Sequence, residues 1–500
     1  MRLYFQAGDF PWSPERYHYA AEQMMLTLFP GERPEYPEGI PHNMSGEDNG
    51  AVFALHRGGE LAEVSAQVRR PQGCRSGTAR FPSRDLDRPP EEVYHTVQHA
   101  LKLAFYQAGT ALLGYEPPWG ALTGVRPVKL PTRSLLAGAT PAQAAQELQR
   151  EYHVSPVRAA LAVDCAKASV EALQSLKAQE VSLYIGIPFC PTRCAYCSFV
   201  SADVGRTLKL VDPYVDALLR EIEETGLVLR EAGLAVRSFY MGGGTPTTLS
   251  ADQLDRLLSQ CKKSLPLDGC TEYTVEAGRP DTITQEKLLA LARHHTSRIS
   301  INPQTLEGPV LEAIGRRHTP GDIRAAYELA RAGGFSCINM DLIAGLPRDS
   351  FAGFRRSLEG VLAMGPENIT VHTLALKKGS ALMERGGALP SGEEVARMLD
   401  FSREILTTSG YHPYYLYRQK YMSGSLENVG WAKPGTENLY NIVMMEELHT
   451  VVSLGAGGVT KLIQDGKILR LANPKYPHDY LSGLDQVLGQ KAEIRTFHMR

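Results

Sequence analysis

Residues 184–197 read YIGIPFCPTRCAYC, a short apolar strand that runs into a loop with three cysteines. Cys190, Cys194 and Cys197 are spaced C-x₃-C-x₂-C. Three thiolates at this spacing can hold three irons of a [4Fe–4S] cube and leave the fourth iron without a protein ligand. Such an iron can act as a Lewis acid towards a bound molecule and pass an electron to it. The stretch therefore predicts a cluster-binding loop at the end of a strand.

Zinc and a disulfide are the alternative explanations of three clustered cysteines. A structural zinc site usually has four nitrogen or sulfur ligands, often in two separated pairs. The chain contains no second C-x₂-C pair. Disulfides fit poorly, because the cluster has an odd number of cysteines and the composition is that of a cytosolic protein. The spacing favours the iron–sulfur interpretation.

The bulk composition indicates an ordinary globular protein of two or three domains. Of the 500 residues, 43% are hydrophobic and 22% are charged, and the net charge of −2 gives no sign of a nucleic-acid or membrane surface. We find neither a signal peptide nor an apolar run long enough to cross a membrane. Eight cysteines are too few for a disulfide framework, so we expect a reducing, cytoplasmic location.

The first predicted domain covers residues 1–175 and is a small α+β unit with a bridging helix. Residues 51–55 and 61–68 look like two strands joined by Gly58-Gly59, which is a hairpin signal. A strand at 2–5 and helices at 14–28 and 91–113 complete the pattern. We also expect Ser155 to cap a bridging helix that buries Cys165.

The second predicted domain, 176–380, alternates strands and helices. Serial βα units give a parallel sheet with helices outside, and chemistry then lies at the carboxyl ends of the strands. We expect Asp212 and Ser250 to cap two of the helices. The third predicted region, 381–500, begins with a helix over 393–409 and ends in a small cap. The six expected strands are 181–187, 236–241, 271–277, 297–302, 336–343 and 367–374.

Several strand ends carry residues that suit a bound ligand. The second strand ends in Gly242-Gly243-Gly244-Thr245, whose glycines allow close approach of a ligand or simply form a tight turn. The third ends at Glu276, which is either a solvated loop residue or an acceptor of hydrogen bonds. Asp341 lies within an apolar strand, where an unpaired carboxylate would be costly. A functional partner for Asp341 is therefore expected.

These motifs together resemble the coproporphyrinogen III oxidase-like branch of the radical S-adenosylmethionine (SAM) superfamily. The matching elements are I-P-F-C-x₃-C-x-Y-C, G-G-G-T-P-T, a glutamate on strand three, R-I-S-x-x-x-Q and D-L-I-x-G-L-P. They span roughly residues 181–380, and the glycines of 455–458 give a weaker match. The N-terminal region with T-G-V-R-P at 123–127 is similar to that of HemZ-type coproporphyrinogen dehydrogenases.

The resemblance implies a partial (β/α)₆ TIM-like barrel that holds a [4Fe–4S] cluster and SAM. Cys190, Cys194 and Cys197 would ligate the cluster, and Tyr184 would lie near the cluster and the sulfonium. Tyr184, Glu276 and Asp341 are the implied catalytic residues. The implied SAM contacts are Gly243, Gly244, Thr245, Glu276, Gln304, Arg316 and Asp341.

The implied reaction is the oxygen-independent conversion of coproporphyrinogen III to protoporphyrinogen IX in haem biosynthesis. A 5′-deoxyadenosyl radical takes a hydrogen from a propionate β-carbon, CO₂ leaves and a vinyl group remains. The implied partners are the tetrapyrrole and a reducing electron donor such as flavodoxin or ferredoxin. Four propionates call for cations, and our candidates are Arg126, Lys129, Arg418 and Lys420.

Two further functions of the same branch stay open, a haem-binding chaperone and a radical SAM enzyme that modifies haem. The best-characterised oxidases carry a fourth cysteine where this chain has Phe199, as in the haem-chaperone members. The branch often has a histidine at the position of Gly186. The nearest match to the H-N-x-x-Y-W motif of the chaperones is 437–441, with a glutamate in place of the histidine, and His449 lies close by in the sequence.

Overall fold

The computed structural model describes residues 1–6, 9–37, 49–197, 202–203, 207–376, 380–385, 388–419 and 422–499. The chain divides into two compact units. Unit 1 comprises Met1–Ser134, Gly138–Val163 and Arg418–Leu426, and unit 2 comprises Leu135–Ala137, Asp164–Tyr417 and Glu427–Arg500. No helix in the described part is long and apolar enough to cross a membrane.

Unit 1 contains a four-stranded sheet in the order β1-β2-β3-β4, with β1 parallel to β2 and the other pairs antiparallel. The predicted hairpin is confirmed as β2 and β3. Strand β4 was not predicted, because its sequence is polar. It packs closely on helix α2, since a Cβ on Gly77 would lie 2.3 Å from the Ala104 carbonyl oxygen. The elements are β1 (Arg2–Phe5), α1 (Glu15–Leu28), β2 (Gly50–Arg57), β3 (Leu61–Arg70), β4 (Gly73–Pro82) and α2 (Pro90–Leu113).

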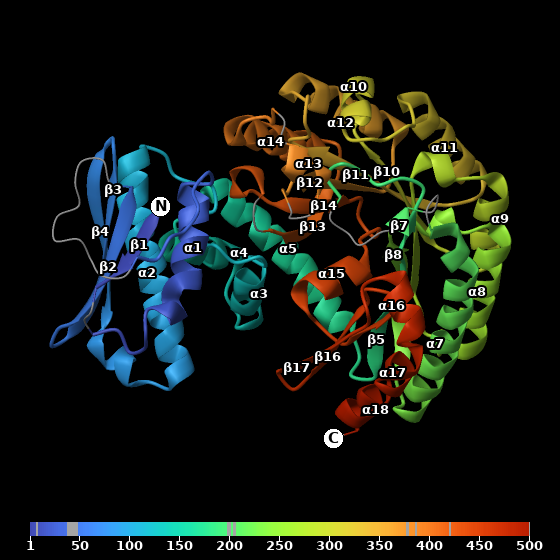
Figure 1. Ribbon diagram of the computed structural model, residues 1–500, viewed down its shortest axis with the longest axis horizontal. Coiled ribbons are helices and arrows are strands. Elements are labelled where there is room, and N and C mark those ends of the chain that lie inside the picture. Colours follow the sequence, from blue (N-terminus) through green and yellow to red (C-terminus); the bar gives the residue numbers. More distant parts are fainter. Residues whose placement is uncertain are drawn as a thin grey trace. The chain divides into compact units, whose positions relative to one another are not determined.

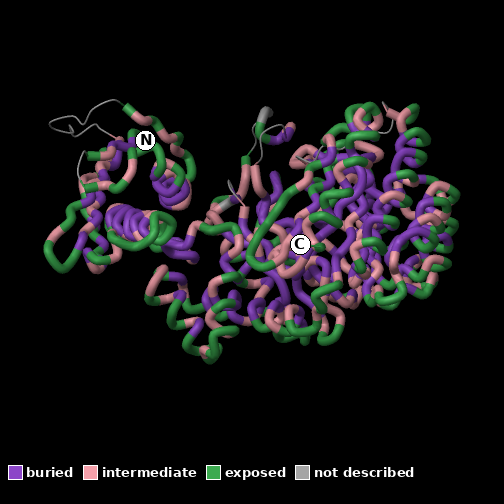
Figure 2. Tube along the Cα trace, turned by 90° about the horizontal axis from the view of Figure 1, so that it is seen from below, coloured by how far each residue is buried: buried purple, intermediate pink, exposed green. Residues whose placement is uncertain are grey.

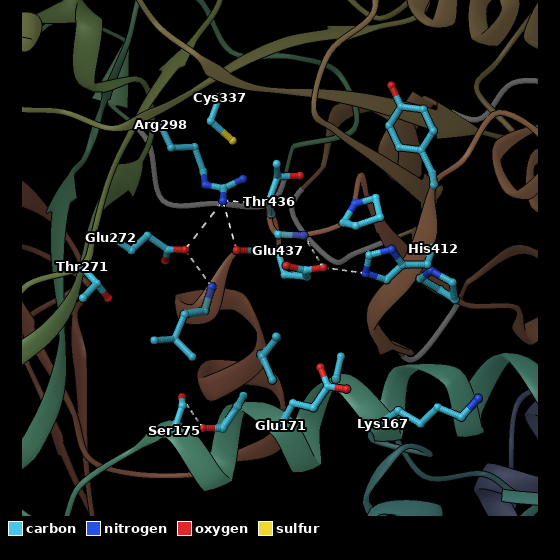
Figure 3. A pocket seen from close by; sticks show the side chains of 18 of the residues that line it. Lys167, Glu171, Ser175, Thr271, Glu272, Arg298, Cys337, His412, Thr436 and Glu437 are labelled. Atoms are coloured by element: carbon cyan, nitrogen blue, oxygen red, sulfur yellow. Dashed lines mark hydrogen bonds and ion pairs between the residues drawn. The ribbon is translucent and has the colours of Figure 1, made fainter.

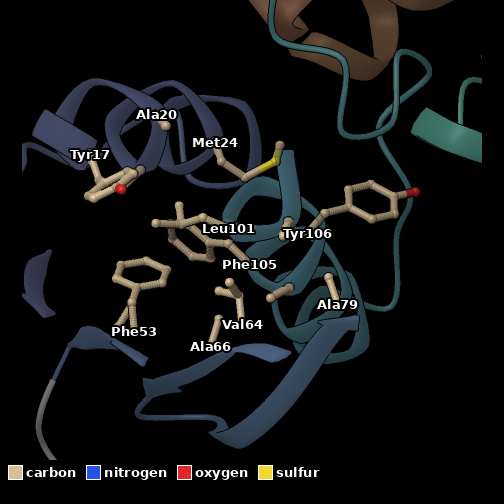
Figure 4. Packing of buried hydrophobic residues seen from close by; sticks show 14 of the residues in the cluster. Tyr17, Ala20, Met24, Phe53, Val64, Ala66, Ala79, Leu101, Phe105 and Tyr106 are labelled. Atoms are coloured by element: carbon tan, nitrogen blue, oxygen red, sulfur yellow. The ribbon is translucent and has the colours of Figure 1, made fainter. Parts of the chain in front are cut away.

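Helices α1 and α2 bury their apolar faces against this sheet. Met24 of α1, Phe53 of β2 and Phe105 of α2 are fully buried, and Figure 4 shows them in one cluster. The rings of Phe53 and Phe105 meet edge to face with centroids 5.1 Å apart, a favourable aromatic arrangement. The chain then forms α3 (Lys129–Leu136), α4 (Pro141–Tyr152) and α5 (Pro156–Ser175).

Unit 2 is built on an eleven-stranded sheet in the order β13-β14-β12-β11-β10-β9-β8-β5-β15-β16-β17. The six predicted strands are all present, and their neighbours pair in parallel. They are β5 (Glu180–Ile187), β8 (Ala235–Gly243), β9 (Glu272–Gly278), β10 (Arg298–Gln304), β11 (Cys337–Ala344) and β12 (Asn368–Thr373).

Helices connect these strands and lie outside the sheet (Figure 1), and Figure 2 shows exposed residues along their outer sides. Ser250 caps α8 as predicted, in a capping box with Gln253. The prediction for Asp212 was wrong: α7 begins at Val211 and Asp212 lies in its first turn, where it accepts a hydrogen bond from Gln253. The helices are α7 (Val211–Glu231), α8 (Ala251–Ser264), α9 (Gln285–Arg293), α10 (Gly308–Ala313), α11 (Pro320–Ala332) and α12 (Phe351–Met364).

The residues after 380 extend the same sheet at both edges, so the predicted boundary at 380 falls within one unit. Strand β15 pairs in parallel with β5 and was not predicted. Strands β14 and β13 follow β12 in antiparallel order. The elements are α13 (Ala381–Arg385), α14 (Gly392–Thr408), β13 (His412–Tyr417), β14 (Asn428–Ala432), α15 (Leu439–Glu446), β15 (Val451–Leu454), β16 (Val459–Gln464), β17 (Lys467–Ala472), α16 (Pro477–Ser482), α17 (Leu484–Gly489) and α18 (Ala492–His498).

A buried carboxylate joins α7 to this C-terminal segment. Glu221 is fully buried and lies 2.7 Å from the ammonium of Lys491. It also accepts hydrogen bonds from Tyr480, Asn473 and the Gly455 amide at 2.6–2.8 Å. A buried carboxylate needs such partners, because its desolvation is otherwise uncompensated. Glu221 therefore holds the glycine segment 455–458 beside β5.

Candidate functional site

The three-cysteine loop starts at the carboxyl end of β5, as predicted. Cys190 ends the short strand β6 (Phe189–Cys190), which pairs with β7 (Ala202–Asp203). Cys194 is nearly buried, whereas Cys190 and Cys197 are partly exposed. None of the eight cysteines, all of which are described, forms a disulfide. Phe199, at the position of the fourth cysteine of the oxidases, lies outside the described residues.

The glycine turn after β8 is bonded to the start of the cysteine loop. The Gly244 amide donates to Ile187 O at 2.7 Å and the Thr245 amide donates to Phe189 O at 2.8 Å. A Cβ on Gly244 would lie 2.5 Å from Phe189 O and 3.0 Å from Cys190 Sγ. Glycine is therefore needed here to keep the space beside a thiolate open. The Thr245 hydroxyl lies 3.5 Å from the same Sγ.

Arg316 reaches the far side of the cysteine loop from the segment after α10. Its side chain is buried and donates to Asn302 O at 2.5 Å and to the Tyr196 hydroxyl at 3.2 Å. Burial lowers the pKa of Arg316, but the neighbouring Tyr196 and Cys194 raise it to a net increase. The guanidinium is thus a permanent positive charge between β10 and the loop. Its Nε atom is buried and has no hydrogen-bond partner among the described residues.

Tyr240, which was not predicted as a site residue, lies between Tyr184 and Glu276. The Tyr240 hydroxyl donates to Glu276 Oε1 at 2.5 Å, and the rings of Tyr184 and Tyr240 are nearly parallel with centroids 6.3 Å apart. Tyr440 of α15 stacks on Tyr240 at 4.5 Å. Tyr240 and Gly242 lie two residues apart on β8 and therefore face the same side of the sheet. A Cβ on Gly242 would lie 2.9 Å from both Tyr240 and Glu276.

The pKa of Glu276 is raised to about 7, chiefly by burial and also by the charge of Asp341. The hydrogen bonds from Tyr240 and the Gly243 amide and the charge of His372 act in the opposite direction and are included in this value. Gly243 has φ of +110°, a conformation that glycine adopts readily, and a Cβ there would lie 3.3 Å from the Tyr184 hydroxyl. Gly243, Tyr184 and Glu276 thus lie together at one end of the barrel.

Asp341 has the partners that its apolar strand required. Asn339 donates to Asp341 Oδ1 at 2.7 Å, and His372 Nε2 lies 3.7 Å from Oδ2. Burial raises the pKa of Asp341, but the hydrogen bonds and charge of His372 together with Asn339 and Thr370 bring it below its usual value. At neutral pH Asp341 is therefore ionised, whereas Glu276 titrates in this range. His372 was not predicted as a site residue.

Two oxygen atoms on β10 and its end are buried without a donor among the described residues, Asn302 Oδ1 and Gln304 Oε1. Gln304 also has φ of +68°, which is strained for a residue with a side chain. Buried acceptors without donors are costly and indicate a missing partner. The ammonium and hydroxyl groups of SAM are donors of this kind, and Arg316 Nε is a donor for its carboxylate. These residues therefore fit SAM.

The cysteine loop likewise fits a cluster. Its three thiols are in one loop, its turn is braced by β8, and Gly244 leaves space beside Cys190. Among the residues with described side chains, no three of the types His, Cys, Asp and Glu are gathered closely enough to hold a single metal ion. In a cube the three thiolates bind three different irons.

The predicted propionate-binding cations belong to a different part of the chain. Arg418 is buried and donates to the carbonyl oxygens of Leu122 and Ser425, while its guanidinium lies 5.4 Å from the centroid of the Trp119 ring. It therefore braces the loop around Trp119 within unit 1, and a substrate contact for Arg418 stays a prediction. Arg126 and Lys129 stay predictions, and Lys420 lies outside the described residues.

A cavity of about 1140 Å³ opens at the opposite, amino-terminal ends of the barrel strands (Figure 3). Its charged wall includes Arg298, and Glu272 lies 3.8 Å from this arginine. His412 and Glu437 form an ion pair of 2.6 Å at its rim. The apolar wall comes from α5 and α15 and is formed by Ala168, Ala172, Leu439 and Ile442.

His449, which is near the haem-motif position in the sequence, is partly buried and hydrogen-bonded within the protein. Its Nε2 lies 2.8 Å from the hydroxyl of Ser182, near the amino-terminal end of β5. Burial and, to a smaller extent, the charge of Arg237 lower the pKa of His449 to about 4. The imidazole is thus neutral and packed at the amino-terminal end of β5.

Comparison with known proteins agrees with the geometry. The family model described as the Radical SAM superfamily matches residues 184–358. The oxygen-independent coproporphyrinogen-III oxidase-like protein HemZ of Bacillus subtilis (strain 168) is 39% identical over 447 residues, which are 88% of this chain and 88% of that protein. The heme chaperone HemW of Escherichia coli (strain K12) is 28% identical over 62% of this chain and 77% of its own.

The solved structure of coproporphyrinogen III oxidase (HemN) from Escherichia coli, a radical SAM enzyme, has the same fold. It matches with a TM-score of 0.53 and 24% identity over 64% of this chain and 72% of that one. The cofactors of the chain are accordingly a [4Fe–4S] cluster and SAM.

Because the pKa of Glu276 is raised in the folded protein, we expect the free energy of unfolding to depend on pH. The folded protein keeps the Glu276 proton up to about pH 7, whereas the unfolded chain releases it near the ordinary value of 4.5. The folded state thus binds more protons between these values. The free energy of unfolding of the wild type should therefore fall with rising pH relative to Glu276→Gln, by at most about 1.4 kcal/mol per pH unit and about 3 kcal/mol in all.

Urea denaturation of the iron-free proteins at pH 5, 6, 7 and 8 measures this difference. Glu223→Gln, an exposed change on α7, is the control and should show no pH-dependent difference. A Glu276→Gln difference that does not change with pH would mean that Glu276 has an ordinary pKa in the folded protein.

Proposed function

We propose a function for this chain, which belongs to the radical SAM superfamily and within it to the oxygen-independent coproporphyrinogen-III oxidase-like family. The proposed reaction is the oxidative decarboxylation of the propionates of coproporphyrinogen III to vinyl groups, as a coproporphyrinogen III dehydrogenase. The substrate is inferred from the name of the HemZ relative, which covers 88% of this chain. The observation that carries the proposal is the convergence of cysteine loop, buried acceptors and Arg316 at one end of the barrel.

The residues of the chain have separate tasks in this proposal. When bound, the cluster and SAM supply a 5′-deoxyadenosyl radical. Cys190, Cys194 and Cys197 hold the cluster. Gln304 and Asp341 accept hydrogen bonds from SAM, and the buried charge of Arg316 faces its carboxylate. Preorganised groups of this kind lose little free energy to rearrangement when the ligand binds.

Glu276 is the proposed acid–base group of the site. Its pKa of about 7 lets it accept or release a proton at neutral pH. Tyr240, which donates to it at 2.5 Å, fixes the orientation of the carboxyl group. The ring of Tyr184 lies beside that of Tyr240, with centroids 6.3 Å apart.

Each vinyl group formed requires the loss of two electrons. One leaves with the β-hydrogen that the radical abstracts, the carboxyl group departs as CO₂, and the second electron passes to an acceptor. Radical formation also consumes one electron from a reducing donor, for which flavodoxin or ferredoxin is the proposed class. We place this reaction in the cytoplasm, as part of haem biosynthesis.

An anaerobic turnover assay tests the proposed function. Reconstituted protein is mixed with dithionite, SAM and coproporphyrinogen III, and 5′-deoxyadenosine, CO₂ and the vinyl product are quantified by mass spectrometry. We expect vinyl product together with 5′-deoxyadenosine, and loss of both to background with Cys194→Ala, because one cluster ligand is missing. SAM cleavage without any change in the tetrapyrrole would reject the substrate, and haem would be tested next as the alternative substrate.

A second candidate function, haem binding as in the HemW relatives, is favoured by the cavity at the amino-terminal ends of the strands. Its volume of about 1140 Å³ and its apolar wall suit a large planar ligand. Glu437 stands where the chaperone motif has histidine, and it is ion-paired with His412. In this candidate His412 would bind the haem iron, because position 437 carries a glutamate.

Absorbance titration with haem tests this second candidate. We expect a Soret band characteristic of histidine ligation in the wild type and in His478→Ala, whose histidine is 80% exposed. His412→Ala should lose this band. An unchanged band in His412→Ala would reject the cavity as the haem site.

A further inference from the structure

The cysteine loop is held at a third point that neither the glycine turn nor Arg316 provides. Thr192 lies between Cys190 and Cys194, in the middle of the loop. Its carbonyl oxygen accepts a hydrogen bond from Arg279 Nη1 at 3.1 Å, and its hydroxyl oxygen accepts one from the same nitrogen at 2.7 Å. One buried nitrogen thus contacts both the main chain and the side chain of a loop residue.

Arg279 is itself fixed in place. It follows the end of β9, is only 3% exposed, and forms a two-point ion pair with Asp281 at 2.9 Å for each bond. The short turn Pro280–Thr282 that carries Asp281 is tied down in turn, because the Thr282 hydroxyl donates to Arg279 O at 2.8 Å and contacts Thr247 at 2.7 Å. Planar two-point pairs of this type fix direction as well as distance.

The other contacts of the loop lie elsewhere along it. Strand β8 binds its start through Gly244 and Thr245. The amide of Ala195 donates to Ile314 O at 3.0 Å, and Arg316 reaches Tyr196, so these bonds hold the part around Cys194 and Cys197. Between these two regions, Arg279 donates to the segment that joins Cys190 and Cys194.

We propose that Arg279 is a positioning residue for the iron–sulfur cluster, which it serves by holding Thr192 and thereby setting the separation of Cys190 and Cys194. Its side-chain bonds are to Thr192 and Asp281, so it acts through the loop. Because Asp281 neutralises its charge, its effect is on loop geometry and not on the net charge around the cluster. Groups that orient metal ligands in this way commonly change metal affinity by about 10- to 100-fold when they are removed. The inference rests on the cluster alone and is independent of the tetrapyrrole chemistry.

The test measures cluster retention in the reconstituted protein. Anaerobic holoprotein is mixed with excess iron chelator, and the loss of cluster absorbance is followed in the wild type, Arg279→Gln, Arg279→Lys and Thr192→Ala. We expect iron release to be about 10-fold faster in Arg279→Gln. Thr192→Ala removes only the hydroxyl contact and should be intermediate. Arg279→Lys keeps a donor for Thr192 and should be slower than Arg279→Gln.

Arg331→Gln is the control, because Arg331 of α11 is also an ion-paired arginine and its described contacts do not include the cysteine loop. Its Nη2 donates to both carboxylate oxygens of Glu367 at 2.7–2.8 Å. This variant should release iron at the wild-type rate. Electron paramagnetic resonance of the reduced cluster should change in Arg279→Gln and not in Arg331→Gln. If Arg279→Gln fails to fold, the rate of iron release from Thr192→Ala tests the proposal instead. Wild-type release in Thr192→Ala, or equal release in the two arginine variants, would overturn the proposal.

Discussion

The close approach of three segments at Gly186 fixes where the cysteine loop begins. The Tyr214 hydroxyl of α7 donates to Gly186 O at 2.7 Å and accepts from the Ala456 amide at 2.9 Å. A Cβ on Gly455 would lie 2.5 Å from the same carbonyl oxygen, so only glycine allows this contact. Glu221 then ties Gly455 to α7 and to Lys491. The carboxyl end of β5, and with it Cys190, thus depends on residues more than 200 positions apart.

Two carboxylates within the barrel illustrate how environment separates their roles. Asp341 is surrounded by His372, Asn339 and Thr370, whose combined effect exceeds that of burial, so its pKa is lowered. Glu276 is dominated by burial and by the charge of Asp341, so its pKa rises to about 7. The pair therefore offers one fixed negative charge and one group that exchanges a proton near neutrality, which suits a cationic ligand and acid–base chemistry in one site.

Sequence patterns predicted the six central strands because parallel strands buried on both faces read as apolar runs, and Ser250 was recognised because caps have a local signature. Strand β15 has only four residues and pairs with a strand more than 260 positions earlier, so no local pattern reveals it. Tyr240 and His372 were missed because sequence does not show which polar residues of a strand point inward. The bonds of Arg418 to main-chain carbonyl groups could not be predicted, because such partners have no sequence signature.

We expect the cysteine loop to hold a cluster with one iron open to SAM. Electron paramagnetic resonance of the dithionite-reduced, reconstituted protein, recorded with and without SAM, measures whether it does. We expect a [4Fe–4S]⁺ signal whose g values shift when SAM is added, because SAM binds the open iron. A signal that SAM leaves unchanged, or a protein that retains stoichiometric zinc and no iron, would contradict it.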